Sequence, residues 1–568
     1  MSQPIKIVDL LLICAMFGLF VLVFFFGLGK AQLFEPDEGR NAEIAREILV
    51  TGDWVTPHND FLPALDKPMA FFWLVAAAYK VFGISEWSAR LPSALAALGC
   101  LVLVYQFSRK LWGVRAALWS VLIWTTSIEV FFLARVVIFD MALTLCITLA
   151  LMAFYTALHS EDETSRRRNC CLMYIAMGVG SLIKGPIALI IPAIIVGLFL
   201  VLTKRLRFLG RMSLPTGALI FLTIVIPWYV WAEARNPGYL KYFLWEEHVV
   251  RFLTPHFSRS EPWYYFFLVL AVGFLPWNLV LPAVIKDLRA DWRDERKLFL
   301  ILWVVLPFSF FSLSSSKLPH YILPIFPPLA ILTGEAMQRY ATGAAAKAKW
   351  LLMLPWLVQF LPVLYLSVGA LWPEIFPGAI RAAAAQMAAL FWEFKFVFSI
   401  ILASAIYLGW HHYRKPSEPI PFGLYAAMMI LFPLFMVYIM AGASRFRSAK
   451  GLADESRRFV LEGSRLAVYD TYLCGLPFYL RVSEPIAIVW SGTKGNIMGS
   501  WYVAENQPRS VRGKVLFTFK EFDEIWRKKD QHLLVVVKDK NVPRLGENDS
   551  TPARQLLNLN GYVLATNH

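Results

Sequence analysis

The sequence predicts a mainly α-helical protein that crosses a membrane many times. Of its 568 residues, 58% are hydrophobic and 17% are charged, and the mean hydropathy is +0.54. Apolar runs of about 20 residues, long enough to span a bilayer core, recur from near the first residue to about residue 440. These observations exclude a soluble enzyme, a secreted disulfide scaffold and a disordered protein.

About thirteen membrane spans are predicted from these runs. The first run has neither a basic cluster before it nor a small-residue cleavage site after it, so we expect a retained helix rather than a cleaved signal. Short runs near residue 183 leave one span open, because they could form a hairpin instead. The predicted spans cover residues 10–29, 88–107, 116–132, 136–158, 170–183, 186–202, 214–231, 263–284, 298–311, 321–337, 350–371, 390–410 and 422–440.

Lysine and arginine cluster in alternate connections, which indicates that these loops are cytoplasmic. With a cytoplasmic N-terminus, an odd number of spans places the tail on the outer side, which is the periplasm in a Gram-negative cell. The net charge of +15 is explained by this topology, so we expect contacts with membrane lipids and no nucleic-acid partner. We predict a multi-pass protein of the bacterial inner membrane, with a transmembrane domain over residues 1–440, outer loops at 30–87 and 233–262, and a periplasmic domain over 441–568.

The tail has the pattern of a small α/β domain. Short apolar stretches alternate there with helix-like segments, as in a sheet covered by helices. The predicted strands are 466–469, 486–490, 515–519 and 533–537, and the helix-like segments include 450–462 and 521–529.

The first outer loop contains an amphipathic segment. Its apolar residues recur on one helical face and its charged residues lie opposite, which is typical of a helix in the plane of the membrane interface. The apolar face consists of Ala42, Ala45, Ile48 and Leu49, and the opposite face carries Glu43, Arg46 and Glu47. The second outer loop mixes aromatic and charged residues, a composition suited to the headgroup layer. We therefore expect periplasmic interfacial helices.

The carboxylates of Glu35, Asp37 and Glu38 and the guanidinium of Arg40 follow soon after the first apolar run. Asp37 and Arg40 are separated by about one helical turn, so their side chains can meet at the outer face of the membrane. The alternative is structural, because an aspartate also caps the first backbone amides of a helix well. Capping and catalysis can coexist at Asp37.

Two further charged positions lie at the predicted outer boundary. Asp140 begins an apolar helix, and an ionisable group there is a functional candidate by default, with an ion pair to Arg135 as the alternative. Lys67 immediately precedes an apolar stretch, so its ammonium group either reaches toward lipid phosphate or binds a substrate phosphate.

Six short motifs in this order resemble one family. They are Asp37-Glu38-Gly39-Arg40, Asp66-Lys67-Pro68, the second aspartate Asp140, and the stretches LIKGP (182–186), WEEHVVRF (245–252) and KLPHYILP (317–324). Together they resemble the polyprenyl-phosphate-sugar-dependent GT-C glycosyltransferases. The chain looks most like the lipid A 4-amino-4-deoxy-L-arabinose transferase family, which is related to the protein O-mannosyltransferases. A GT-C membrane fold is therefore expected.

The resemblance implies roles for individual residues. Cations aimed at a polyprenyl phosphate leaving group would stabilise its developing negative charge, while carboxylates would face the oxocarbenium-like sugar. The family pattern matches Asp37 and Asp140 as catalytic residues, Arg40, Lys67, Arg251 and Tyr321 as the donor-phosphate site, and Glu38, Lys184 and Lys317 as further substrate-binding residues.

Two departures from the family pattern concern the metal and the substrates. The aminoarabinose transferases usually have Glu where this chain has Asp66, a position associated there with metal binding. Asp66 and His248 are the candidate ligands of a divalent metal, although a lone interfacial histidine more often only forms hydrogen bonds. After Arg40 the chain reads Asn41-Ala42, where those enzymes tend to have an aromatic residue, so sugar and acceptor could differ from aminoarabinose and lipid A.

The leading functional hypothesis is an inverting transferase that moves a sugar, aminoarabinose or a related one, from an undecaprenyl-phosphate-linked donor to lipid A or another envelope acceptor. Such lipopolysaccharide modification is associated with polymyxin resistance in the family that the chain resembles. The alternatives are a protein O-glycosyltransferase of the same superfamily and a transporter or flippase of polyprenyl-linked sugars. Transporters bind substrate near the membrane midplane, whereas the informative charges here lie at the outer boundary, which favours the enzyme. We expect a monomer that needs no further cofactor.

Overall fold

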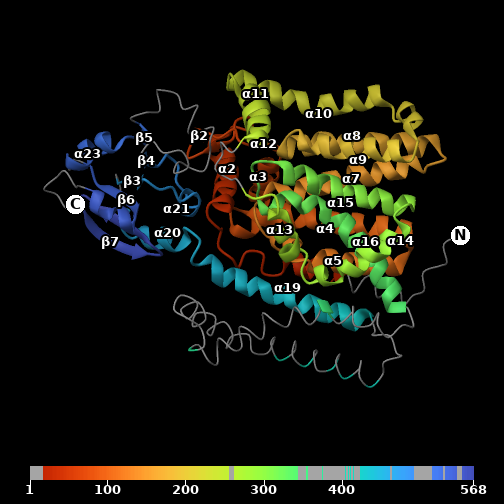
Figure 1. The fold of residues 1–568 in the computed structure, drawn as a ribbon. Helices are drawn as coiled ribbons and strands as arrows, with labels where there is room; N and C mark the ends of the chain where they lie inside the picture. Colours follow the sequence, from red (N-terminus) through yellow and green to blue (C-terminus); the bar gives the residue numbers. More distant parts are fainter. Residues whose placement is uncertain are drawn as a thin grey trace.

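The computed structural model describes residues 17–18, 20–254, 261–342, 422–460, 464–490, 514–528, 531–545 and 553–568, with a few single positions between 354 and 414. The predicted spans 350–371 and 390–410 lie outside the described residues, as does the first part of 10–29. Within the described ranges, long helices run side by side in one bundle, and the strands of the tail gather beyond one end of it, with α2 and α3 between the two parts (Figure 1).

Five described helices are long and apolar enough to cross a membrane, or six if one bent pair counts as a span. The predicted multi-pass character is therefore confirmed, and each of the five coincides with a predicted run. The five are α4 (Glu86–Trp112), α7 (Phe139–Leu158), α10 (Leu214–Arg235), α15 (Glu295–Leu313) and α19 (Phe422–Ser444).

The runs near residue 183 form two helices that turn back on each other. Helix α8 (Glu163–Lys184) ends at Gly185, whose φ of +91° is accessible to glycine, and α9 (Ile187–Leu202) begins directly after Pro186. The two helices pack together, and α8 also packs along α7. Their hairpin places Lys184 at the turn.

Three predicted spans are interrupted. The run 116–132 is divided at Ser127 into α5 (Val114–Thr126) and α6 (Ile128–Leu133). The run 263–284 bends by 106° between α13 (Tyr265–Gly273) and the segment formed by η4 (Trp277–Val280) and α14 (Leu281–Asp291). The run 321–337 begins as a 3-10 helix, η5 (Pro319–Ile325), before α16 (Phe326–Thr342). Pro276, Pro282 and Pro324 explain the last two interruptions, because proline lacks the N–H group that continues a helix.

Helix α2 (Asp37–Thr51) is enclosed by protein along its charged face as well as its apolar face, and its place in the membrane interface stays a prediction. Its charged face is as buried as its apolar face, since Glu43 and Glu47 have no exposed surface. Arg46 donates to both Glu43 oxygens at 2.6–2.7 Å and to the Val482 carbonyl of the tail at 2.7 Å. The amphipathic pattern therefore reflects a helix enclosed between two parts of the same chain, because protein partners replace water on its polar side.

The rest of the two outer loops positions the site. After α2 come a short antiparallel hairpin, β1 (His58–Asn59) and β2 (Leu62–Pro63), and the apolar helix α3 (Ala70–Phe82). The second loop contains α11 (Tyr239–Lys241), the π-helix η2 (Tyr242–Val250) and α12 (Arg251–Leu253). Stretches of π-helix of this kind often occur at functional sites.

The tail forms a six-stranded sheet in the order β5-β4-β3-β6-β8-β7. Strands β5 to β6 in that order are parallel, and β8 and β7 add an antiparallel edge that the sequence analysis missed. The strands are β3 (Arg465–Tyr469), β4 (Ala487–Val489), β5 (Leu516–Phe517), β6 (Leu533–Lys538), β7 (Arg554–Leu559) and β8 (Tyr562–Thr566). The helices are α20 (Lys450–Ser456), α21 (Leu476–Leu480), α23 (Phe519–Arg527) and the 3-10 helix η8 (Asp539–Arg544).

The tail docks directly on the beginning of α2. Glu35 accepts hydrogen bonds from the backbone N–H groups of Cys474 and Gly475, both at 2.7 Å, and its own N–H donates to the Arg447 carbonyl at 2.8 Å. Gly39 faces the same turn, and a Cβ atom there would lie 2.5 Å from the Gly475 nitrogen. Glycine at residue 39 therefore permits the close contact between α2 and the tail.

We expect Glu35 to make stability fall as the pH rises. Burial raises the pKa of Glu35 to about 7, although its two backbone hydrogen bonds oppose the shift. The folded protein holds this proton more tightly than the unfolded chain, so the contribution is fully present below the unfolded pKa and is lost as the pH rises through about 7. When the pH is raised from 5.5 to 8, the melting temperature of wild type should fall by about 2–4 °C more than that of Glu35→Gln. Thermal unfolding of both proteins in detergent measures this difference.

Burial lowers the pKa of His58 and of His248, so these two histidines contribute to stability with the opposite sign. The readout is therefore the difference between the two proteins rather than either slope alone. Parallel melting curves for wild type and Glu35→Gln across the range would contradict the raised pKa of Glu35.

Candidate functional site

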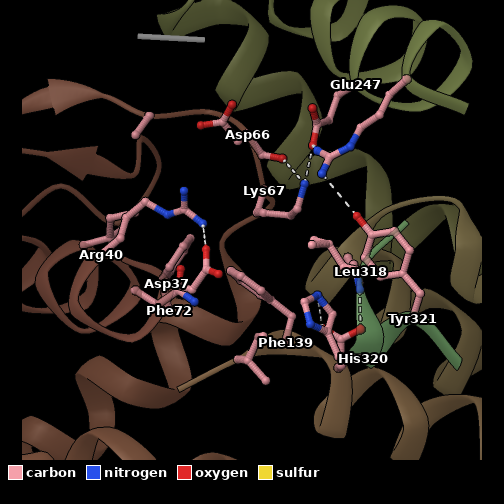
Figure 2. A pocket seen from close by; sticks show the side chains of 17 residues that line it. Asp37, Arg40, Asp66, Lys67, Phe72, Phe139, Glu247, Leu318, His320 and Tyr321 are labelled. Atoms are coloured by element: carbon pink, nitrogen blue, oxygen red, sulfur yellow. Dashed lines mark hydrogen bonds and ion pairs between the residues drawn. The ribbon is translucent and has the colours of Figure 1, made fainter. Parts of the chain in front are cut away.

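One pocket collects most of the charged residues singled out in the sequence. It lies where the starts of α2 and α7 meet the end of α8, the η2–α12 segment, η5 and the loop before α3, and its space of about 740 Å³ includes a part open to solvent. Figure 2 shows the labelled side chains arranged around this central space. The pocket is lined by Asp37, Arg40, Asn41, Ile44, Ala64, Asp66, Lys67, Phe72, Ile138, Phe139, Asp140, Lys184, Glu247, Arg251, Leu318, His320 and Tyr321.

Asp37 and Arg40 approach the pocket from the first turn of α2. Pro36 occupies the N-cap position and Asp37 is the first helical residue, so the capping role considered for Asp37 is wrong. Instead, Arg40 donates to Asp37 at 2.8 Å (Figure 2). The Asp37 side chain is 43% exposed, so the carboxylate is both paired and accessible from the pocket.

Asp140 stands at the first turn of α7 with 2% of its side chain exposed. Lys184, from the end of α8, forms an ion pair with one Asp140 oxygen, and His320 Nε2 lies 3.7 Å from the other. The alternative pairing with Arg135 is wrong, because that guanidinium donates to the carbonyls of Val23 and Phe26 at 2.9 and 2.7 Å. Asp140 is thus joined to two other residues of the pocket.

A second cluster combines cations with a phenol. Lys67 Nζ donates to Glu247 Oε1 at 2.5 Å, and Arg251 binds the same Glu247 oxygen. Arg251 Nη2 also donates to Tyr321 Oη at 3.1 Å (Figure 2). Burial alone would raise the pKa of Glu247, but Arg251 and Lys67 lower it to about 2. Glu247 therefore remains ionised across the physiological range.

The two clusters are connected through the side of the pocket opposite α2. Lys184 Nζ lies 4.6 Å above the centre of the Tyr321 ring, a cation–π contact, while the same lysine pairs with Asp140. Asp66 accepts a hydrogen bond from Tyr242 at 2.9 Å. One continuous chain of contacts therefore joins Lys67, Glu247, Arg251, Tyr321, Lys184 and Asp140.

Two residues predicted to bind substrate lie outside this pocket. Glu38 forms a two-pronged pair with Arg90, both bonds at 2.9 Å, and also accepts from the Val137 and Phe34 N–H groups. Its carboxylate is fully used in holding α2 against α4, so its placement is structural. Lys317 donates to the carbonyls of Ser314 at 2.7 Å and Glu261 at 2.9 Å, because its side chain turns back into its own loop.

The candidate metal ligands are not assembled into a metal site. His248 Nδ1 lies 2.6 Å from the Phe243 carbonyl, and its ring packs against Gly185, whereas Asp66 binds Tyr242. Burial lowers the pKa of His248. Within the described part of the chain, no three His, Cys, Asp or Glu side chains form a group that could hold a metal ion.

Two residues of the site, Glu247 and His320, were not among the residues predicted to be catalytic or to bind substrate. Glu247 lies four residues before Arg251, a spacing that brings side chains together on a helix, so it could have been found from the pattern. His320 adjoins Tyr321 in a motif that was noticed, but nothing in the sequence alone indicates that it approaches Asp140.

Glu38 and Asp37 should differ sharply in their effects on stability although they are neighbours. Removing one partner of a buried ion pair costs about 3–5 kcal/mol, because it leaves the other charge uncompensated, whereas a half-exposed pair contributes about 0–1 kcal/mol. We therefore expect Glu38→Gln to lower the melting temperature strongly and Asp37→Asn to leave it nearly unchanged. Thermal unfolding of both purified variants measures this, and equal losses would show that Glu38 does not hold α2 in place.

Comparisons with known proteins point to one class. A family model described as dolichyl-phosphate-mannose-protein mannosyltransferase matches residues 66–231. Among curated relatives, the undecaprenyl phosphate-α-4-amino-4-deoxy-L-arabinose arabinosyl transferase of Edwardsiella ictaluri is 35% identical over 335 residues, covering 58% of this chain and 60% of the relative. That of Pseudomonas aeruginosa (strain LESB58) is 36% identical over 330 residues, covering 58% and 59%. The match thus spans about 60% of the length of these relatives.

The fold is similar over nearly the whole chain to a solved structure. The crystal structure of ArnT from Cupriavidus metallidurans bound to undecaprenyl phosphate matches with a TM-score of 0.83 and 26% identity, covering 98% of both chains. The apo structure of that protein matches with a TM-score of 0.80 and 25% identity, again over 98% of both. The resemblance to the GT-C glycosyltransferases is therefore confirmed. Within that class, the chain is similar in sequence and in fold to the ArnT aminoarabinose transferases.

Proposed function

We propose that this protein is an inverting glycosyltransferase that moves a sugar, aminoarabinose or a related one, from undecaprenyl phosphate to lipid A or another envelope acceptor. The observation that carries the proposal is the single pocket in which a Lys67–Arg251–Tyr321 cluster faces the carboxylates Asp37 and Asp140. This arrangement stands in a fold similar to that of an ArnT bound to undecaprenyl phosphate.

The donor phosphate is the ligand that the cationic cluster suits best. Lys67 and Arg251 supply charge-assisted hydrogen bonds, and the Tyr321 hydroxyl adds a donor beside them. When the bond from the sugar to the phosphate oxygen breaks, its electron pair stays on the phosphate. Cations already in place stabilise that charge without reorganising, which lowers the barrier. Arg40 faces the same space from α2.

The two aspartates suit the sugar. As the leaving group departs, the anomeric carbon gains positive charge, and a carboxylate facing it stabilises that charge. Lys184 holds Asp140 in a fixed position, and Arg40 does the same for Asp37. A phosphate acceptor with a second pKa of about 6 is already ionised near pH 7 and needs no base. A hydroxyl acceptor would instead require one of these carboxylates to remove its proton.

The remaining features of the proposal concern the cell. We propose that the protein lies in the bacterial inner membrane as a monomer, with the pocket and the domain over residues 441–568 on the periplasmic side of a transmembrane domain over 1–440. The match of residues 66–231 to a mannosyltransferase family supports a protein O-glycosyltransferase as the second candidate. Its acceptor would be a protein hydroxyl rather than lipid A.

Transfer by the purified protein tests the proposal. In nanodiscs containing undecaprenyl-phosphate-linked aminoarabinose and lipid A, mass spectrometry should detect the modified lipid with wild type. Asp37→Asn and Asp140→Asn should lose most of the activity, about a hundredfold or more, because an amide keeps the shape but not the charge. Inactive wild type on this pair, together with glycosylation of a protein acceptor, would favour the second candidate. Near wild-type turnover in either variant would remove that aspartate from the catalytic role.

Lys67 should matter for donor binding rather than for folding. A charge-assisted contact contributes about 1.5–3 kcal/mol, so Lys67→Met should weaken donor affinity by about ten- to a hundredfold. Lys80→Met is the matched control, because Lys80 is an exposed lysine at the end of α3 and does not line the pocket. Affinity for undecaprenyl phosphate in nanodiscs is the measurement, and equal affinities for the two variants would place the donor phosphate elsewhere.

A further inference from the structure

The carboxylate Glu247 stands inside the cationic cluster that the donor phosphate is proposed to use. One of its oxygens, Oε1, binds both Lys67 and Arg251, and only 1% of the side chain is exposed. The cluster therefore already contains one negative charge before any phosphate arrives. An anion-binding site built for the greatest affinity would not include a buried carboxylate.

The second oxygen of Glu247 indicates that the residue does more than bridge two cations. Oε2 is buried, and none of the described residues forms a hydrogen bond to it. A carboxylate with a purely structural role is expected to satisfy both oxygens, because an unpaired buried acceptor costs free energy. Here the unpaired oxygen leaves negative potential beside the two cations.

The charge of the lipid phosphate beside Lys67 and Arg251 changes during the proposed reaction. The donor is a phosphodiester with one negative charge, and the released undecaprenyl phosphate is a monoester with a charge of about −1.5 to −2 near pH 7. Lys67 and Arg251 alone would carry two positive charges and would match the product better than the donor. With Glu247 included, the three side chains sum to one positive charge, which matches the donor.

We propose that Glu247 is a positioning residue that adjusts this cluster to a phosphodiester and thereby promotes release of the undecaprenyl phosphate product. The inference rests on the proposed function. It adds a reason why the site would bind the phosphodiester donor in preference to the more highly charged phosphomonoester product. Glu247 acts through Lys67 and Arg251. It holds both side chains at the pocket wall, and its negative charge offsets part of their positive charge.

The groups around Glu247 define the pH range for a test. Glu247 raises the pKa of Arg251, which stays charged over the neutral range, and Glu247 itself stays ionised because Arg251 and Lys67 lower its pKa to about 2. Burial lowers the pKa of the neighbouring His248, so that ring is neutral above its ordinary value. The other charged or titratable side chains close to the cluster include Arg40 from α2, Asp66, Lys184 from the end of α8, Tyr242 and Tyr321. The second ionisation of the lipid phosphate, with a pKa of about 6, then accounts for the expected change.

Binding of undecaprenyl phosphate to the full-length protein in nanodiscs tests the inference. Wild type should bind it no more tightly at pH 8 than at pH 5.5. Glu247→Gln should bind it about tenfold or more tightly at pH 8, with a smaller gain at pH 5.5, and its steady-state turnover should fall while the first turnover is retained. Glu246→Gln is the matched control on the same helix and should behave as wild type, since Glu246 does not line the pocket.

The possible outcomes separate this inference from the proposed function. Wild type that fails to bind undecaprenyl phosphate overturns both. Wild type that binds it, together with equal or weaker binding by Glu247→Gln at both pH values, overturns the role of Glu247 alone. Glu247→Asp keeps the charge and should keep the wild-type dependence on pH. If Glu247→Gln does not fold, wild-type affinity that rises severalfold between pH 5.5 and pH 8 overturns the inference by itself.

Discussion

The buried pair between Glu38 and Arg90 is the constraint on which the site depends. Four hydrogen bonds converge on one carboxylate and hold α2 against α4 and the segment before α7. Because successive residues of a helix point about 100° apart, fixing Glu38 toward the bundle turns Asp37 and Arg40 toward the pocket. A structural residue thus determines the direction of the two neighbouring functional candidates, and the family motif that contains all three combines packing with chemistry.

Charges in the pocket are paired in advance. Asp37 has Arg40, Asp140 has Lys184, and Glu247 has both Lys67 and Arg251. Pairing makes it possible to hold so many ionised groups near a membrane, where an isolated charge is costly. Pairing also means that a substrate must replace ion pairs that already exist within the protein. Selectivity therefore depends on the difference in free energy between the contacts with the substrate and the ion pairs that they replace. In the proposed reaction, that difference is greatest at the phosphate.

Short-range patterns in the sequence predicted much of this structure. The long apolar runs predicted α4, α7, α10, α15 and α19, and the alternation in the tail predicted its four parallel strands. Position in the sequence indicated Asp37, Arg40, Lys67 and Asp140, and the resemblance to a family added Lys184, Arg251 and Tyr321. The pairing of Asp140 with Lys184 joins residues 44 apart and has no local signal. The burial of the charged face of α2 was not predicted, because an amphipathic pattern shows that one face is polar but does not show what covers it. Here part of the cover is local, since the N–H groups of Asp60 and Phe61 donate to Glu47, and part comes from Val482, 436 residues beyond Arg46.

That distance along the chain has a consequence for the biogenesis of the protein. Helix α2 leaves the ribosome well before Val482, which binds Arg46 on its polar side, and before Cys474 and Gly475, which bind Glu35 just ahead of the helix. All three follow more than 400 residues later. At about 5–20 residues per second, the helix waits for roughly 20–90 seconds of translation before its partners exist. During that interval Glu43, Arg46 and Glu47 keep one face of the helix compatible with water, so the same charges that become buried at the end protect the unfinished chain from premature contacts.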